Sequence, residues 1–389
     1  MHAPPPETTT RARHLPGRRV IGVGVAALPL ALLAACGSSS SSGSASGGIA
    51  VEANDTTCAP ATSTGVAGTS KFTIKNAGNK VTELYVYAPG DRVVGEVEQV
   101  GPGISRDLTV ELQPGSYELA CKPGGSGDGI RAPFTVTGAA APAAGADPRL
   151  ATAVAQYRSF VIAQSGELVT RTQEFAAAVQ AGDVERAKTL YPTTREPWER
   201  VEPVAESLGD LDPKIDAREG DVPAAEWGGF HRIEKALWVD KNLDGMAPVA
   251  QALVTDVSAV KSGIEKADLT ASNLGNGANE LLTEVATGKV TGEEERYSHT
   301  DLWDFTANVD GAKQAYLPLR PVLLDRNPAL AQQLDTQFAA VESALASFER
   351  GNGWELYNAL TPEQTKALAD RVDALAEPLS RLTAAVLPA

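Results

Sequence analysis

The stretch Gly138-Ala-Ala-Ala-Pro-Ala-Ala-Gly-Ala-Asp-Pro148 divides the chain into two parts of different texture. Residues 138 to 146 carry no charge and are typical of an inter-domain linker. Before them, polar and apolar residues alternate in short runs, as in Lys71-Phe-Thr-Ile-Lys75. After them, apolar residues recur at three and four positions, as in Leu150, Val154 and Tyr157. The sequence therefore predicts a β domain followed by an all-α domain.

Turn signals and helix boundaries refine the prediction for each part. Pro89-Gly-Asp and Gln113-Pro-Gly-Ser separate the alternating runs, so residues 49 to 137 predict a small antiparallel β-sandwich. Asp147-Pro148 and Thr361-Pro-Glu are typical helix starts, and Gly182-Asp is a typical stop. About 240 residues of this kind suffice for two packed bundles, so residues 147 to 389 predict a double helical-bundle domain.

The N-terminus has the pattern of a bacterial lipoprotein signal. Arg18 and Arg19 precede an apolar run that is too short for a comfortable membrane span and that ends in Leu33-Ala-Ala-Cys36. We therefore expect residues 1 to 35 to be a signal peptide, Cys36 to be the lipidated first residue, and residues 36 to 48 to be a Ser/Gly tether. A single transmembrane anchor is the alternative. Arg18-Arg19 also allows export by the twin-arginine route instead of the general one, although the surrounding residues match that motif poorly; by either route the folded part is expected outside the cytoplasm.

The charge balance excludes one class of partner and favours another. The chain has 49 acidic and 34 basic residues and a net charge of -15. Within it, residues 147 to 389 hold 38 acidic and 23 basic side chains, whereas residues 49 to 137 hold 10 and 7. Such a chain repels a phosphate backbone, so nucleic-acid binding is excluded and cationic partners are favoured. Three cysteines cannot form a disulfide scaffold at this length.

Two histidines beyond the N-terminal segment, His231 and His299, lie in stretches with clustered acidic and aromatic residues. His231 and Glu234 are spaced i, i+3, so on a helix they share a face and can chelate one ion; a surface or capping pair is the alternative. His299, Asp301 and Asp304 form a second cluster, for which a helix cap is the alternative.

Longer stretches resemble a known family. Phe230-His-Arg-Ile-Glu-Lys-Ala-Leu-Trp238 resembles the His-x-x-Glu signature of the imelysin-like peptidases. The stretches from 191 to 206 and from 292 to 305 resemble the EfeO branch of that family. The resemblance implies an extracytoplasmic iron-binding component that works with an EfeU-type membrane permease and an EfeB-type haem peroxidase.

Iron in either oxidation state accepts carboxylate and imidazole ligands. We expect the iron site to combine the two histidine clusters with carboxylates of neighbouring helices, and Zn2+ or Cu2+ would fit the same donors. The predicted ligands are His231, Glu234, Glu202, Glu199, Glu167, His299, Asp301 and Asp304. For the glutamates at 167, 199 and 202, a solvated helix face is the alternative.

The β part resembles the cupredoxin-like domain that begins longer EfeO proteins. A blue-copper centre needs two histidines with a cysteine, but no histidine occurs between residues 15 and 230. Cys58 and Cys121 therefore form either a disulfide or, together with Glu83, Glu96 and Glu98, a second metal site. Export to an oxidising compartment favours the disulfide.

Three functions fit these observations. The first is an iron receptor without bond chemistry. The second is a metallopeptidase in which Glu234 or Glu202 is the general base, although the chain lacks the His-Glu-x-x-His signature. The third is oxidation of the metal by the β domain, against which the missing histidines count.

Overall fold

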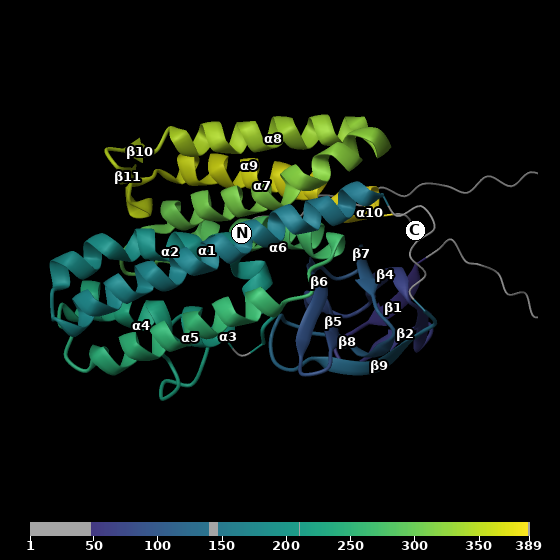
Figure 1. Cartoon of the computed structure of the whole chain (residues 1–389), viewed down its shortest axis with the longest axis horizontal. Helices are drawn as coiled ribbons and strands as arrows, with labels where there is room; N and C mark the ends of the chain where they lie inside the picture. Colours follow the sequence, from purple (N-terminus) through teal and green to yellow (C-terminus); the bar gives the residue numbers. More distant parts are fainter. Residues whose placement is uncertain (1–47, 140–146, 210, 388–389) are drawn as a thin grey trace, which may run out of the picture. The chain divides into compact units, whose positions relative to one another are not determined.

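The computed structural model describes residues 48–139, 147–209 and 211–387, all within one compact unit. The predicted signal peptide, the lipidation site Cys36, most of the tether and most of the linker lie outside the described residues. Figure 1 shows strands in the first part of the described chain and helices in the second, so the predicted fold class is confirmed. No described helix is both long enough and apolar enough to cross a membrane.

The β domain consists of two sheets, ordered β2-β1-β4-β7 and β3-β9-β8-β5-β6. Most neighbouring strands are antiparallel, whereas β1 with β4 and β3 with β9 are parallel. The strands are β1 Ile49–Ala53, β2 Cys58–Pro60, β3 Thr64–Val66, β4 Gly68–Asn76, β5 Thr82–Ala88, β6 Arg92–Val100, β7 Ser105–Leu112, β8 Gly115–Cys121 and β9 Ile130–Thr137.

The alternation seen in the sequence places one side of each strand in the domain core. In β4, Phe72 and Ile74 are fully buried, whereas the alternating residues Lys71, Thr73 and Lys75 are partly or fully exposed. Phe72 meets Phe134 of the other sheet edge to face, with ring centroids 5.3 Å apart. A disulfide between Cys58 of β2 and Cys121 of β8 also joins the two sheets.

The helical domain begins at α1 and continues to the end of the described chain. Its helices are α1 Pro148–Gln180, α2 Val184–Glu206, α3 Leu211–Asp216, α4 Gly229–Lys235, η1 Ala236–Asp240, α5 Met246–Lys266, α6 Ala271–Thr287, η2 Lys289–Thr291, α7 Asp301–Arg326, α8 Pro328–Ala346, η3 Tyr357–Ala359, α9 Pro362–Leu379 and α10 Leu382–Val386. A short hairpin, β10 Glu349–Arg350 with β11 Gly353–Trp354, follows α8.

The helix starts predicted from sequence are present. Asp147 caps α1 with Pro148 in the first turn, and Asp183 caps α2 after Gly182. Thr361 forms a capping box at the start of α9. In Figure 1, α1 and α2 lie with α3, α4 and α5, and α7, α8 and α9 form a second group. Both groups share one continuous apolar core.

Candidate metal centre

Short elements between the long helices bring the site together. Asp216 ends α3, and His231 and Glu234 share one face of α4, which continues into the π-helical turn η1. Gly229 allows α4 to lie close against α3. Its φ is +71°, and a Cβ there would lie 2.2 Å from the carbonyl oxygen of Ile215. Only glycine fits this contact and this backbone conformation.

His231 is the centre of the site. It is buried, and both of its ring nitrogens face carboxylates. Nδ1 lies 3.3 Å from Glu234 Oε2, and Nε2 lies 3.3 Å from Asp216 Oδ1 and 3.4 Å from Glu294 Oε1. Among the described residues, Nε2 has no aligned hydrogen-bond partner. A buried ring nitrogen that faces two carboxylates without such a bond is suited to a cation.

Two groups of three donors have the spacing of a metal site. Asp216, His231 and Glu294 form one, and His231, Glu234 and Glu295 form the other; in each group the donor atoms lie within 4.8 Å of one another. The imidazole and carboxylate donors suit iron, zinc and copper. Because His231 belongs to both groups, its two ring nitrogens point to two adjacent candidate positions.

Glu234 is held in place by the segment before α7. Its Oε1 accepts hydrogen bonds from the backbone N–H groups of Tyr297 and Ser298, at 2.9 and 2.7 Å. The Ser298 hydroxyl in turn donates to Glu295 Oε2 at 2.8 Å. Both candidate groups therefore include a residue of this segment, and its hydrogen bonds hold Glu234 and Glu295 in place.

Aromatic side chains form an apolar wall beside these acids. Phe230 is fully buried and packs against Phe175 and Tyr191, each with a centroid distance of 6.3 Å. The Tyr191 hydroxyl lies 3.3 Å from Glu295 Oε1 and donates to it. Trp227 and Trp238, which flank His231 in the sequence, are only partly buried. Excluding water from this side strengthens charge interactions within the site.

A second layer of buried charge surrounds the His231 groups. Lys289 is fully buried, and its Nζ lies 2.5 Å from Glu199 Oε2 and 3.0 Å from Glu202 Oε2. Asn308 donates to Glu199 Oε2 at 3.1 Å. Arg195, also fully buried, contacts Glu199 from the same helix. Buried ions persist only when they are paired, and here each cation is shared by several carboxylates.

The protein environment shifts the pKa values of these groups in opposite directions. Burial and Arg195 oppose the charging of His231, but the carboxylates of Asp216, Glu234 and Glu294 outweigh them and raise its pKa. Burial opposes ionisation of Glu294, yet Lys289 and His231 hold its pKa at about 2. Burial and the neighbouring Glu234 raise the pKa of Glu295 to about 8. Despite burial, Arg195 and His231 lower the pKa of Asp216, and His231 lowers that of Glu234, so among the four acids of the two candidate groups only Glu295 has a raised pKa.

The two predicted aspartates of α7 lie beside the centre. Asp301 accepts a hydrogen bond from the backbone N–H of Glu295 at 3.2 Å, and burial raises the pKa of Asp301 to about 7. Asp304 is buried, and neither of its oxygens has an aligned hydrogen bond among the described residues. Burial raises the pKa of Asp304 well above its usual range. Both residues therefore support the cluster and belong to neither three-donor group.

Two predicted ligands are not brought into the centre. The Glu167 side chain is 41% exposed on α1 and pairs with Arg171, which in turn pairs with Glu196 of α2. His299 belongs to neither donor group. It takes a left-handed conformation with φ of 59°, and its backbone bonds to Glu295 and Tyr357. It directly precedes Thr300, the N-cap residue of α7, and among the described residues no side-chain cap hydrogen bond forms there.

Sequence reasoning missed Asp216, Glu294 and Glu295 as members of the donor groups, and Arg195 and Lys289 as buried cations. The run Glu293-Glu-Glu295 was the available signal, since it lies in the acidic stretch that leads to His299. Asp216 gave no comparable signal. Its role depends on α3 meeting α4, which no local pattern encodes.

The β domain offers a different set of acids. Since Cys58 and Cys121 are joined in a disulfide, the alternative in which both act as thiolate ligands does not hold for this structure. Glu83 is buried; burial, followed by the charge of Glu98, raises its pKa to about 7. Among the described residues, groups of three or more clustered metal donors occur only in the helical domain.

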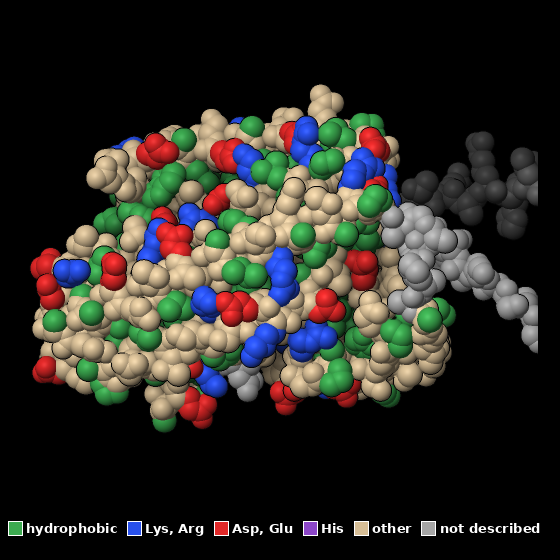
Figure 2. All heavy atoms as spheres, viewed as in Figure 1, with side chains coloured by type: hydrophobic (Ala, Val, Ile, Leu, Met, Phe, Trp, Pro, Cys, Tyr) green, Lys and Arg blue, Asp and Glu red, His purple; other side chains and the backbone are tan. Residues whose placement is uncertain are grey.

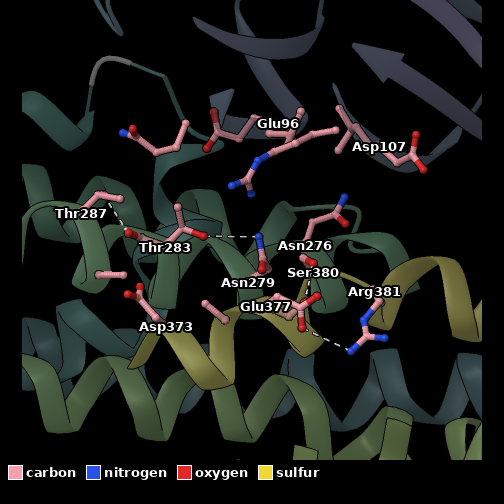
Figure 3. A pocket seen from close by; sticks show the side chains of 16 residues that line it. Glu96, Asp107, Asn276, Asn279, Thr283, Thr287, Asp373, Glu377, Ser380 and Arg381 are labelled. Atoms are coloured by element: carbon pink, nitrogen blue, oxygen red, sulfur yellow. Dashed lines mark hydrogen bonds and ion pairs between the residues drawn. The ribbon is translucent and has the colours of Figure 1, made fainter. Parts of the chain in front are cut away.

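The His231 site is distinct from the open pocket shown in Figure 3. That pocket has a volume of about 550 Å³ and is lined mainly by polar side chains of β6, β7, α6 and α9. Glu96 is the only predicted ligand that reaches it. On the face shown in Figure 2, acidic and basic side chains are interspersed. The candidate metal centre is therefore an internal charge cluster.

Comparison with known proteins agrees with this architecture. Residues 153–382 match the imelysin family, and residues 25–130 match the cupredoxin-like domain. The fold and site thus define an imelysin-type protein with a cupredoxin-like domain at its N-terminal side.

The curated relatives narrow the class further. The chain is 41% identical over 341 residues to the proteins named iron uptake system component EfeO of Escherichia coli K12, Shigella flexneri and Shigella sonnei. Each alignment covers 86% of this chain and 90% of the relative. The chain belongs to the EfeO family, as the resemblance in its sequence indicated.

Proposed function

We propose that the protein is the extracytoplasmic iron-binding component of an iron uptake system. The observation that supports this most is His231, whose two buried ring nitrogens each face carboxylates of a three-donor group. The names of its relatives assign those proteins to iron uptake. Iron is the cargo in this proposal, and binding and release are the whole function.

The donor set suits iron of either oxidation state. Carboxylates satisfy hard ferric iron, and an imidazole with carboxylates also satisfies ferrous iron. Asp216, Glu234 and Glu294 are the carboxylates closest to His231, so we propose these as ligands, with Glu295 as the further donor on the Nδ1 side. Zn2+ and Cu2+ would compete for the same donors.

A route for the ion leads past Arg218. Glu294 is 4% exposed, and its outer oxygen Oε2 lies 3.2 Å from Nη1 of Arg218, a side chain that is 35% exposed. Arg218 also pairs with Asp221 in the segment between α3 and α4. Movement of this one partly exposed arginine would open Glu294 to solvent.

The setting and partners follow from the family and the N-terminus. We propose that Cys36 is lipidated after cleavage of residues 1 to 35, and that the protein hands iron to an EfeU-type permease and works with an EfeB-type haem peroxidase. The domain bounds are 49–137 and 147–389 in this proposal, joined by the linker 138–146. The export route stays a prediction.

A peptidase reaction is the second candidate, because the imelysin family is grouped with peptidases. Glu234 would be its general base on a metal-bound water. In the structure, however, one oxygen of Glu234 is held by two backbone N–H groups and the other faces His231. Casein or peptide turnover lost in Glu234→Gln would favour this candidate over the receptor.

The experiment that tests the receptor function is a titration of the mature protein with Fe2+ under anaerobic conditions. We expect His231→Ala to weaken binding about 100-fold or more, since it removes the donor common to both groups. His299→Ala is the matched control, because it removes the other histidine of residues 147–389 and should leave affinity unchanged. Equal affinity in both variants would reject the site.

A carboxylate pair extends the same test. Asp216→Asn keeps the size of the side chain but removes a charged donor, and we expect about tenfold weaker Fe2+ binding. Glu167→Gln removes an acid of the exposed face of α1 and should bind as the wild type does. Repeating both titrations with Fe3+ citrate would show which oxidation state the site prefers.

A further inference from the structure

Arg195 is placed where an incoming cation would go. Its guanidinium is fully buried among five carboxylates from α2, α3, the segment before α7, and α7 itself. The partners are Glu199, Asp216, Glu294, Glu295 and Asp304. No role for this residue follows from the His-x-x-Glu signature, because Arg195 lies on another helix.

The guanidinium uses the same oxygens as His231. Asp216 Oδ1 and Glu294 Oε1, which face His231 Nε2, are both held by Arg195. Arg195 Nη2 lies 3.4 Å from Glu294 Oε1 and 3.2 Å from Asp216 Oδ2, and Nη1 pairs with Asp216 Oδ1. An ion bound by the Asp216, His231 and Glu294 group would share these lone pairs with a permanent positive charge.

Two cations on one set of carboxylates oppose each other. At separations of about 4 Å, and with the effective dielectric of a protein interior, unit charges interact by several kcal/mol. A guanidinium does not lose its proton in proteins, so the repulsion between Arg195 and a bound cation persists at every physiological pH.

We propose that Arg195 is an internal counter-ion that competes with the bound metal ion for Asp216 and Glu294, and so limits its affinity and speeds its release. This rests on the proposed receptor function. A protein that passes an ion to another protein needs a limited affinity for that ion. Competition from the Arg195 side chain for the same carboxylates would limit the affinity. The side chain acts on the ion through shared oxygens and is not itself a ligand.

Arg195 has further partners that would remain if an ion displaced it from Asp216 and Glu294. Its Nε side faces Glu295 at 2.5 Å and Asp304 at 3.6 Å, and Nη2 also contacts Glu199. The flat group lies over the ring of Phe230, with 5.4 Å between Cζ and the ring centroid. Arg195 can therefore give up Asp216 and Glu294 and remain paired.

The test compares two buried cations of the same cluster. Arg195→Gln removes the one that contacts Asp216 and Glu294, whereas Lys289→Gln removes one that contacts Glu199, Glu202 and Glu284. Fe2+ affinity is measured anaerobically by competition with a chelator, and dissociation by stopped flow. We expect Arg195→Gln to bind about tenfold or more tightly and to release Fe2+ correspondingly slowly, with a change of about threefold or less in Lys289→Gln.

Several outcomes would overturn the proposal. Unchanged or weaker binding by Arg195→Gln would show that the arginine supports the ion. Equal gains in both variants would show a general field effect without competition for particular oxygens. If wild-type binding does not depend on His231, the receptor function fails first; if it does, and Arg195→Gln is not tighter, only this inference fails.

A second variant covers the case in which Arg195→Gln does not fold. Arg195→Lys keeps the charge but replaces the two-pronged guanidinium by a shorter point charge, so its hold on Asp216 and Glu294 is weaker. We expect Fe2+ binding about threefold tighter than wild type, with an unchanged far-UV circular dichroism spectrum. Binding equal to or weaker than wild type would overturn the proposal by itself.

Discussion

The two domains of this protein differ in the polar and charged side chains that they bury. The β domain has an apolar core that is closed by a disulfide, and its buried acid Glu83 has a pKa of about 7. The helical domain instead buries Arg195 and Lys289 among many carboxylates around His231. Paired internal charge costs desolvation energy that an apolar core avoids. The comparison shows a conventional apolar core in the first domain and an internal cluster of paired charges in the second.

The largest effect we expect concerns the disulfide. Cys58→Ala with Cys121→Ala removes a link between residues 63 positions apart, and loop-closure entropy predicts a loss of about 4 kcal/mol in unfolding free energy. All five tryptophans lie in residues 147–389, so their fluorescence reports on the helical domain and far-UV circular dichroism on both.

Urea unfolding of the double variant and of the wild type would then be followed by both signals. A urea midpoint that shifts in circular dichroism but not in tryptophan fluorescence would show that the disulfide stabilises the β domain alone. Equal shifts of both midpoints would contradict this, because the two domains would then unfold as one cooperative unit. Wild type treated with a reducing agent serves as the control.

The next effect concerns the backbone under His231. Gly229→Ala adds a Cβ that would lie 2.2 Å from Ile215 O at a positive φ, and we expect a loss of about 3 kcal/mol in stability together with weaker Fe2+ binding. Gly166→Ala in α1 is the control: nothing lies within 4 Å of its Cβ, so it should be neutral or slightly stabilising. Thermal unfolding and Fe2+ titration of both variants check this, and an unperturbed Gly229→Ala would contradict the close packing of α3 on α4.

A third, smaller effect is a pH dependence of cation binding. Only the neutral imidazole can be a ligand, and the surrounding carboxylates raise the pKa of His231 above its ordinary 6.5. A proton must therefore leave when the ion binds, so affinity should rise by up to about tenfold per pH unit between pH 6 and 8. Mn2+ calorimetry in two buffers of different ionisation enthalpy would measure the released proton. Flat affinity with no proton release would contradict the assignment, and His299→Ala should keep the wild-type slope.

The smallest effect distinguishes the acids of the β domain. Glu83 has a pKa of about 7 against an ordinary 4.5, so the folded state binds more protons than the unfolded state in that window, and stability falls as pH rises through it. Glu83→Gln has no carboxyl to ionise, so it should avoid this loss of stability. We expect its unfolding free energy to exceed that of the wild type by about 1 kcal/mol at pH 8 and by little at pH 5.

The measurement for Glu83 is a series of melting temperatures from pH 5 to pH 8. The difference between Glu83→Gln and wild type should grow with pH, whereas Glu52→Gln, at an exposed position of β1, should show a constant difference. A constant difference for Glu83→Gln as well would mean that its carboxyl is not shielded from water.

Much of the fold and part of the site could be predicted from local sequence patterns. Alternation in β4 and the caps at Asp147 and Thr361 depend on near neighbours, and so does the pairing of His231 with Glu234 on one turn of helix. Glu199 and Glu202 lie near the centre as expected, but bound to Lys289. Glu167 was predicted together with them, yet its side chain is 41% exposed and pairs with Arg171.

By itself, the sequence determined the two domain types, the helix starts, the His-x-x-Glu pair and the membership of the EfeO family, because each of these depends on local pattern or on long matching stretches. Only the tertiary structure decided that Asp216 and Glu294 meet His231 on one side and Arg195 on the other. The physical reason is that burial and Coulomb interactions depend on distance in space. The helices α2, α3 and α4 and the distant segment that carries Glu294 must pack together before these charges can repel or stabilise one another.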